Sequence, residues 1–238
     1  PSFFARIALV FLFANVLDKK IELLHETKNI LHFPKHFPEL TVLTGAVFVL
    51  IFMERHLSAI IIGGATLMGM LIYAGIRKRI ILILLAAGLL TGTLIITKGD
   101  SFRMQRMRTY KKYSLFFKER DLSQSAGSDY QVRESLTALT SGGLFGTGIA
   151  RGRAKHYYLP EARTDYVYTI IGEEAGYLGA FTVFALHSLL FFAALRMANR
   201  QENLYYKLLG AGMALNIYTN VLVNTGVAMS ILPPTGNT

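Results

Sequence analysis

The chain has 238 residues, of which 52% are hydrophobic and 17% charged, a more apolar balance than soluble domains usually have. Several apolar runs approach the roughly 20 residues that cross a bilayer as a helix, and none has the alternation of a membrane barrel strand. The absence of cysteine excludes disulfides and thiolate metal sites. The net charge of +10 comes with no nucleic-acid-binding motif, so we expect an all-α, polytopic membrane protein without a nucleic-acid partner.

Six spanning helices are expected, at residues 2–17, 40–53, 57–76, 80–97, 166–195 and 208–232. The fifth segment is long enough to tilt or to begin above the bilayer. Residues 98–164 form one large polar region. Within it, residues 135–149 are small and moderately apolar, which favours either a dip into the membrane or a short helix on its outer face.

Basic residues in the links between these segments predict the orientation. The alternate links 18–39, 77–79 and 196–207 are rich in Lys and Arg, whereas the short link 54–56 offers only Arg55. Short basic links stay in the cytoplasm, and long loops translocate largely regardless of charge. The sequence therefore predicts that residues 98–164 form a large extracellular loop.

Two carboxylates, Glu161 and Asp165, stand four residues apart at the end of this loop. If a helix opens at Tyr166, Asp165 lies at or beside its N-cap, and spacing alone favours a capping role. A carboxylate at a membrane cavity is nevertheless a functional candidate, because burial of its charge is costly. Glu161 by itself also fits a solvated loop carboxylate.

Basic residues surround these carboxylates and recur after the fourth segment. Lipid headgroups are their more frequent partners, but Arg and Lys also hold the oxygens of a diphosphate. The candidates are Arg151, Arg153, Lys155 and Arg163 near the carboxylates, and Arg103, Arg106 and Arg108 at the start of the loop.

Three further patterns carry polar or special residues. A glycine-rich stretch at 142–148 lacks the Lys-Ser/Thr ending of a phosphate-binding loop, so we expect its glycines to provide turns or close packing. Glu173 and Glu174 fall two helical turns after Asp165, on or near its side of the helix. Asn216, Asn220 and Asn224 form a stripe that favours interhelical hydrogen bonds or a cavity lining, and three histidines between residues 25 and 36 give a weak metal signal.

The loop and the segment after it carry a specific set of motifs. In this sequence they read Tyr130-Gln131, Ser135-Leu136, Ser141-Gly142-Gly143, Phe145-Gly146, Gly148, Lys155, Tyr158-Leu159-Pro160-Glu161, Thr164-Asp165-Tyr166, Ile171-Gly172-Glu173-Glu174, Gly176 and Gly179. With these motifs the chain resembles the SEDS family, the FtsW/RodA/SpoVE membrane proteins of bacteria. The resemblance covers residues 1–238 as a single transmembrane domain. It implies a ten-helix family fold, of which this chain holds about the fourth to ninth helices, so that both ends would lie inside a larger protein.

The resemblance implies a peptidoglycan glycosyltransferase of the bacterial cytoplasmic membrane. Its substrate would be lipid II, a disaccharide-pentapeptide on undecaprenyl diphosphate, and its partner a class B penicillin-binding protein. It assigns the catalytic role to Asp165, as general base on the acceptor sugar. The substrate-binding residues that follow are Lys155, Glu161, Arg103, Arg106, Gln131 and Arg163. The diphosphate is compatible with a divalent cation such as Mg²⁺ or Mn²⁺.

The chain departs from the family pattern at Phe3, Arg55, His56, Glu134 and Arg163. These changes bear on substrate preference and partner contacts rather than on the fold. Two alternatives to a polymerase remain open on the sequence: a flippase for the same lipid-linked precursor, and a non-catalytic scaffold for a transpeptidase. The residues do not separate a role in division from one in elongation or sporulation.

Overall fold

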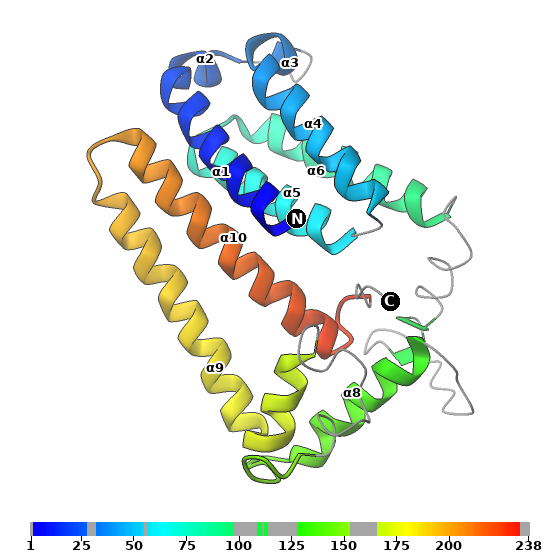
Figure 1. Ribbon diagram of the computed structural model, residues 1–238. Helices are drawn as coiled ribbons and strands as arrows, with labels where there is room; N and C mark the ends of the chain where they lie inside the picture. The colour runs from blue at the N-terminus through cyan, green and yellow to red at the C-terminus, as the bar shows by residue number, and fades with distance from the viewer. Residues whose placement is uncertain are drawn as a thin grey trace. The chain divides into compact units, whose positions relative to one another are not determined.

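The computed structural model describes residues 2–27, 32–54, 57–97, 109–110, 112–113, 128–152 and 166–233. These residues fold into helices and contain no strand, which confirms the all-α prediction. Figure 1 shows the helices α1 (Ser2–Lys19), α2 (Ile21–Glu26), α3 (Phe33–His36), α4 (Pro38–Met53), α5 (Leu57–Tyr73), α6 (Lys78–Thr97), α8 (Ser128–Gly142), α9 (Val167–Asn199) and α10 (Leu204–Ala228).

Each expected spanning segment coincides with one of the longer helices, and local signals explain several of their ends. Pro38 occupies the first turn of α4, where its missing N–H has no intrahelical partner to lose. Gly75 has a φ of 87° in the turn between α5 and α6. By length and composition, α9 is long and apolar enough to cross a membrane, and the apolar helices Pro38–Met53 and Ser58–Tyr73 are shorter. The count of six spans stays a prediction.

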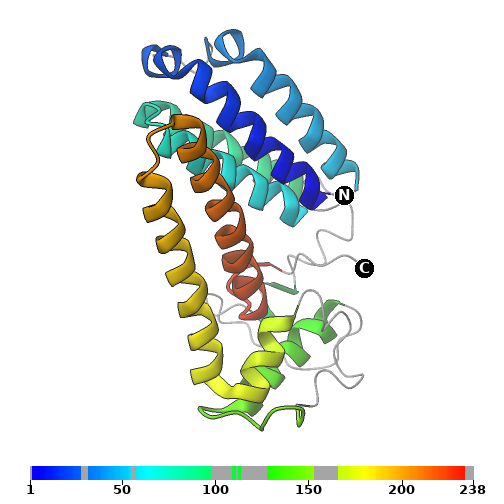
Figure 2. The same cartoon turned by 60° about the vertical axis from the view of Figure 1, so that its left-hand side comes forward.

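The described residues belong to two compact units, and the first comprises those that lie within 1–92 and 188–220. Its core is built from apolar side chains of α1, α4, α5, α6 and α10, together with α2 and the turns that precede α4 and α6. Small residues bring the helices close: a methyl group at Gly212 would lie 2.7 Å from both Val10 Cγ1 and Met70 Sδ. Figure 2 shows these helices from a second direction.

The link at residues 18–39, expected only to be polar, contains the short helices α2 and α3. Contacts with residues distant in sequence hold it in place. Lys20 Nζ lies 3.0 Å from both carboxylate oxygens of Glu39. His25 Nε2 donates to the carbonyl of Ala74 over 3.0 Å, and Arg77 Nε donates to the carbonyl of His25 over 3.2 Å. Helices this short have little stability of their own, so these tertiary contacts account for them.

The second unit comprises residues 93–187 and 221–236. It holds α8, the beginning of α9 and the end of α10. Ser135 of α8 joins all three, because its hydroxyl lies 2.7 Å from Thr169 Oγ1 and donates to the carbonyl of Ala228 over 3.2 Å. All three residues are buried. Within the stretch 135–149, residues 135–142 form the last part of α8, and the position of this stretch relative to the membrane stays a prediction.

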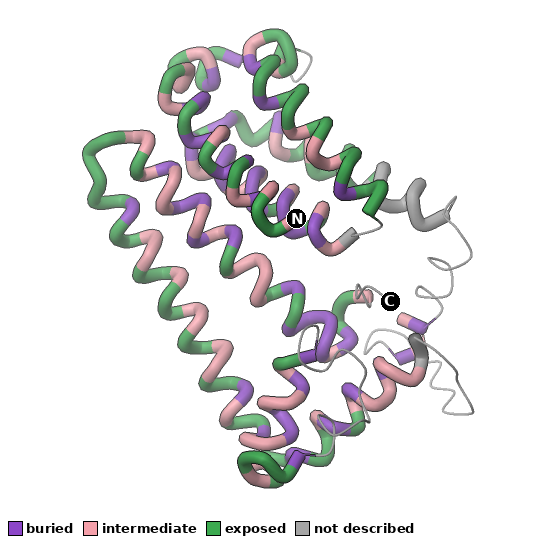
Figure 3. Tube along the Cα trace, viewed as in Figure 1, coloured by how far each residue is buried: buried purple, intermediate pink, exposed green. Residues whose placement is uncertain are grey.

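Large apolar side chains are exposed along several helices rather than gathered in one core. Figure 3 shows exposed and half-buried residues along most of α4 and α9. On α9 they include Phe181, Leu186, Leu189, Leu190 and Phe192. Soluble monomers rarely expose contiguous apolar surface on this scale, so these faces indicate contact with lipid.

Candidate functional site

Helix α9 is broken at Gly176, which has φ 71° and ψ −173°. Figure 1 shows two limbs that diverge at this point, one before the glycine and one after it. A break of this kind leaves the last carbonyls of the first limb and the first N–H groups of the second without intrahelical partners. The segment expected at 166–195 is therefore not one continuous spanning helix.

The loop that follows α8 supplies the missing partners through its own backbone. We call this set of contacts, between residues 143–148 and residues 173–178, the glycine clasp. Its four backbone hydrogen bonds run from Thr147 N to Glu173 O (2.9 Å), Gly148 N to Glu174 O (3.1 Å), Tyr177 N to Gly143 O (2.9 Å) and Leu178 N to Leu144 O (3.2 Å). The Thr147 hydroxyl adds a bond of 3.1 Å to the same Glu173 carbonyl. The clasp thus satisfies two carbonyls and two N–H groups at the break, and unpaired backbone groups are especially costly in a membrane.

Glycine is required at the centre of the clasp by both conformation and space. Gly146 and Gly176 both have positive φ, which is unfavourable for residues with a Cβ. A methyl group at Gly146 would overlap the carbonyl of Glu174 and lie 2.7 Å from Gly176 N. The glycines of this stretch therefore provide turns and close packing, as expected from the sequence.

The first limb of α9 begins directly after the candidate carboxylate. The carbonyl of Tyr166 accepts from the N–H groups of Thr169 (3.0 Å) and Ile170 (3.3 Å), so Tyr166 occupies the N-cap position and Asp165 precedes it in sequence. Tyr166 is buried, and Thr169 is tied to Ser135 as described above. The prediction that a helix opens at this point is confirmed.

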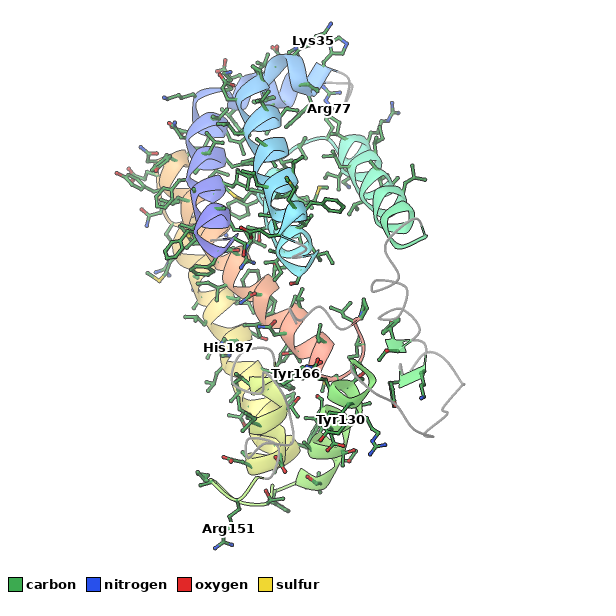
Figure 4. The ribbon with its side chains drawn as sticks, turned by 45° about the vertical axis from the view of Figure 1, so that its right-hand side comes forward. Lys35, Arg77, Tyr130, Arg151, Tyr166 and His187 are labelled. Carbon is green, nitrogen blue, oxygen red and sulfur yellow. The ribbon has the colours of Figure 1, made fainter. Side chains whose placement is uncertain are left out.

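The remaining predicted site residues divide between described and undescribed parts of the chain. Gln131 lies on α8, next to Tyr130, and is half-buried (Figure 4). The other positions lie outside the described residues: Arg103, Arg106, Lys155, Glu161, Arg163 and Asp165. Their roles stay predictions.

The two acidic residues of α9 lie at the end of its first limb, beside the clasp. Glu173 is 3% exposed, and a methyl group at Gly152 would lie 2.8 Å from its Oε2. Its backbone carbonyl is also an acceptor in the clasp. The break after these residues places them in the short limb rather than within the long apolar one, which sequence spacing did not reveal.

Polar groups also occur inside the first unit. Asn216 is buried and Asn220 is half-buried in this unit, whereas Asn224 belongs to the second unit and is exposed, so the three residues of the expected stripe differ in burial. Arg6 is 7% exposed, and its guanidinium lies 5.7 Å from the centre of the Phe3 ring. Among the residues that the structure describes, none forms a hydrogen bond with Arg6 Nε, Arg6 Nη1 or Asn216 Oδ1. Sequence analysis assigned no site role to Arg6, and its position inside an apolar helix was the available signal.

No group of three or more His, Asp or Glu side chains suited to a metal ion occurs among the residues that the structure describes. Two of the three neighbouring histidines make other bonds. His36 Nδ1 lies 2.9 Å from Thr27 Oγ1, and His25 binds the carbonyl of Ala74. Hydrogen bonds within the protein therefore account for two of the three histidines that gave the weak metal signal.

The helices with exposed apolar faces, the broken α9 and its glycine clasp define a helical membrane protein. The whole chain, residues 1–238, matches the FtsW/RodA/SpoVE family, described as cell cycle protein. The chain belongs to this family.

Similar proteins include stage V sporulation protein E of Bacillus subtilis. It is 29% identical over 238 residues, which cover 100% of this chain and 61% of that protein. The probable peptidoglycan glycosyltransferase FtsW of Coxiella burnetii is 32% identical over 208 residues, 86% of this chain and 53% of that protein. Its namesake in Mycobacterium tuberculosis is 34% identical over 173 residues, 73% of this chain and 31% of that protein. The chain thus spans about three fifths or less of the length of these relatives.

Proposed function

We propose that this chain is the central part of a lipid II polymerase that extends glycan strands on the outer face of the cytoplasmic membrane. In this proposal six helices cross the bilayer, the three basic links face the cytoplasm, and the region 98–164 lies outside. The family membership supports it, as do the names of the two FtsW relatives, which describe probable peptidoglycan glycosyltransferases.

The observation that carries the proposal is the construction of the first limb of α9. This limb is fixed at one end by the clasp and near the other by the bonds among Ser135, Thr169 and Ala228. Asp165 is the residue immediately before it. A general base must be held within a narrow range of positions to be effective. A short helix secured near both ends is a suitable support for such a group.

The chemistry follows from the substrate. Asp165, as a carboxylate, takes the proton of the 4-hydroxyl of the acceptor sugar. The freed oxygen attacks the anomeric carbon of the donor, whose bond to the undecaprenyl diphosphate oxygen breaks. A glycosidic bond forms, and the diphosphate leaves with the bonding electron pair. Cleavage of the donor's own bond between sugar and diphosphate drives the reaction, so no nucleotide is needed at an extracellular site.

Negative charge builds up on the departing diphosphate, and positive side chains stabilise it. Lys155 precedes the two carboxylates in sequence, Arg163 lies between them, and Arg103 and Arg106 stand near the start of the same loop. We assign these four side chains to the diphosphate, and Glu161 and Gln131 to the sugar and peptide parts of the substrate. A class B penicillin-binding protein would then cross-link the strands that this chain extends.

The test is glycan polymerisation from purified lipid II by the full-length protein in liposomes. We expect Asp165→Asn to abolish strand formation, because the amide cannot accept the proton. Glu202→Gln is the matched control, since Glu202 is an exposed carboxylate in the link before α10, and it should leave the rate unchanged. Unchanged polymerisation by the Asp165→Asn variant would remove the proposed base.

A flippase for the same lipid is the second candidate, favoured by the buried Arg6 and Asn216 of the first unit. Unpartnered polar groups inside an apolar helix bundle are typical of translocation paths. Transport of labelled lipid II across liposomes distinguishes the two functions. A flippase moves the lipid without lengthening glycan and does so equally well with Asp165→Asn, whereas substitution of Arg6 by Met abolishes its transport.

A further inference from the structure

The loop of the glycine clasp exposes its apolar side chains. Leu144 is 62% exposed, Phe145 80% and Ile149 87%. The segment 143–152 contains no acidic residue, and its one charge belongs to Arg151, which is also exposed. Figure 4 shows the Arg151 side chain projecting away from the helices of its unit. The loop therefore presents an apolar tip beside a single cation.

This exposure is imposed by the backbone. The clasp bonds fix residues 143, 144, 147 and 148 against α9, and Gly146 N donates to Gly142 O over 2.7 Å. Gly146 touches the backbone of Glu174 and Gly176 so closely that no side chain fits between them. The backbone on both sides of Phe145 is thus held against α9 while the side chains of Leu144 and Phe145 are exposed.

The loop lies at one end of the long limb of α9. That limb begins at Tyr177 and ends at Asn199, a rise of roughly 34 Å at about 1.5 Å per residue, close to the ~30 Å thickness of a hydrocarbon core. Its first turns are exposed and apolar as well: Tyr177 is 57%, Leu178 49% and Phe181 54% exposed. Because Leu178 N binds the carbonyl of Leu144, the apolar surface of the loop continues that of the helix.

We propose that residues 143–152 form an interfacial membrane anchor. Leu144, Phe145 and Ile149 insert among the acyl chains of the leaflet next to Tyr177, and Arg151 binds lipid phosphate. Apolar residues with an adjoining aromatic and a cation suit this interface, and Arg binds phosphate oxygens well. The orientation proposed above makes this the outer leaflet, but the anchor does not depend on the proposed chemistry.

The anchor fixes the depth of the clasp in the membrane. It would therefore hold the first limb of α9, and the residues just before it, at a set height above the lipid. A lipid-linked substrate keeps its diphosphate at the same height, since its polyprenyl tail stays in the bilayer. The loop would thus match the height of the protein to that of its substrate.

Site-specific labelling tests the anchor, because the chain has no cysteine. The variants Phe145→Cys and Thr137→Cys are made in the full-length protein, with any cysteine outside this chain replaced by serine, and are labelled with an environment-sensitive fluorophore in liposomes. Thr137 is the control, as an exposed residue of α8. We expect lipid-borne nitroxide quenchers to quench the label at position 145 at least threefold more than at 137, and a water-soluble quencher to show the reverse order.

Equal access of the water-soluble quencher to both labels would overturn the proposal. So would shielding of position 145 that occurs only when a transpeptidase partner is added, since the surface would then be a protein interface. A second measurement tests the role of Arg151. Phosphatidylcholine offsets its phosphate charge with the choline cation, and phosphatidylglycerol does not. Quenching by lipid-borne nitroxide at position 145 should therefore increase when phosphatidylglycerol replaces phosphatidylcholine, and Arg151→Gln should remove this increase. An unchanged increase would exclude Arg151 as the group that binds the anionic headgroup.

Failure of the anchor is distinguishable from failure of the proposed function. The quenching experiment reads the depth of a side chain and involves no turnover. Polymerisation with an exposed label at position 145 would leave the function intact and exclude the anchor. A deeply buried label without polymerisation would support the anchor and count against the proposed function.

Discussion

Substitution of Gly146 by alanine tests the glycine clasp directly. Two penalties add at this position. A Cβ in the left-handed region costs about 1–2 kcal/mol. The methyl group also overlaps the backbone of Glu174, so the loop must move away from α9. Loss of the four clasp bonds then costs about 0.5–1.5 kcal/mol each, and we expect a total of at least about 3 kcal/mol.

Two other glycines separate these contributions. Gly143 also has a positive φ, of 56°, but a methyl group there meets nothing within 4 Å. Gly143→Ala should therefore show the conformational penalty alone, about 1–2 kcal/mol. Gly64 is helical and also faces open space, and Gly64→Ala should cause no loss of stability, because alanine is the better helix former.

Thermal unfolding of the purified full-length protein measures the ranking, and hydrogen exchange locates the change. We expect Gly146→Ala to have the lowest midpoint and to speed amide exchange at residues 147, 148, 177 and 178 relative to Gly143→Ala. If the two variants had equal midpoints and equal exchange at these amides, the overlap would have no consequence. The description of the clasp as a rigid contact would then be wrong.

Two further contacts each give a prediction, one about the free energy of unfolding and one about its dependence on pH. Ser135→Ala removes the buried link to Thr169 and Ala228 and should lower the free energy of unfolding by about 1–3 kcal/mol; in thermal unfolding the double variant with Thr169→Val should lose less than the sum of the single losses. The hydrogen bond from Lys20 lowers the pKa of Glu39 below its ordinary value of 4.5. Because the folded-state pKa is the lower one, this stabilisation is present above pH 4.5 and disappears as the pH falls through the lowered value. Glu39→Gln should thus reduce the unfolding midpoint slightly at pH 7 and have no effect in acid, and an equal reduction at both pH values would contradict this.

The positions of the long helices were predictable from the sequence because apolar runs and their breakers are local signals. Residues 40–53 and 80–97 agree with α4 and α6 to within two residues at either end. The break at Gly176 was not predictable in this way. It interrupts an apolar run without any proline, and the loop that stabilises it lies about 30 residues earlier in the chain. Only the folded backbone brings the two together.

The candidate site was likewise only partly predictable from the sequence. The motif positions are properties of the sequence, and the resemblance they carry agrees with the family match. The structural roles of these motif residues could be predicted only in part. The glycines at 142–148 were expected to serve turns or packing, but their partner on α9 was unknown. The burial of Arg6 and Asn216 depends on which helix faces meet, and a single sequence does not specify this.

The clasp suggests how a loop that supplies no catalytic group could control the proposed catalysis. The first limb of α9 is short, and helices of about nine residues are not stable alone. It persists because the clasp satisfies its last carbonyls and because Thr169 is bound near its start. The position of a residue directly before this limb therefore depends on those contacts. If the proposed function is right, loosening the clasp should reduce the turnover number while Asp165 is still present, whereas we expect Asp165→Asn to remove activity and to leave the clasp closed. Amide exchange at Tyr177 distinguishes the two cases, because it increases only when the loop has moved.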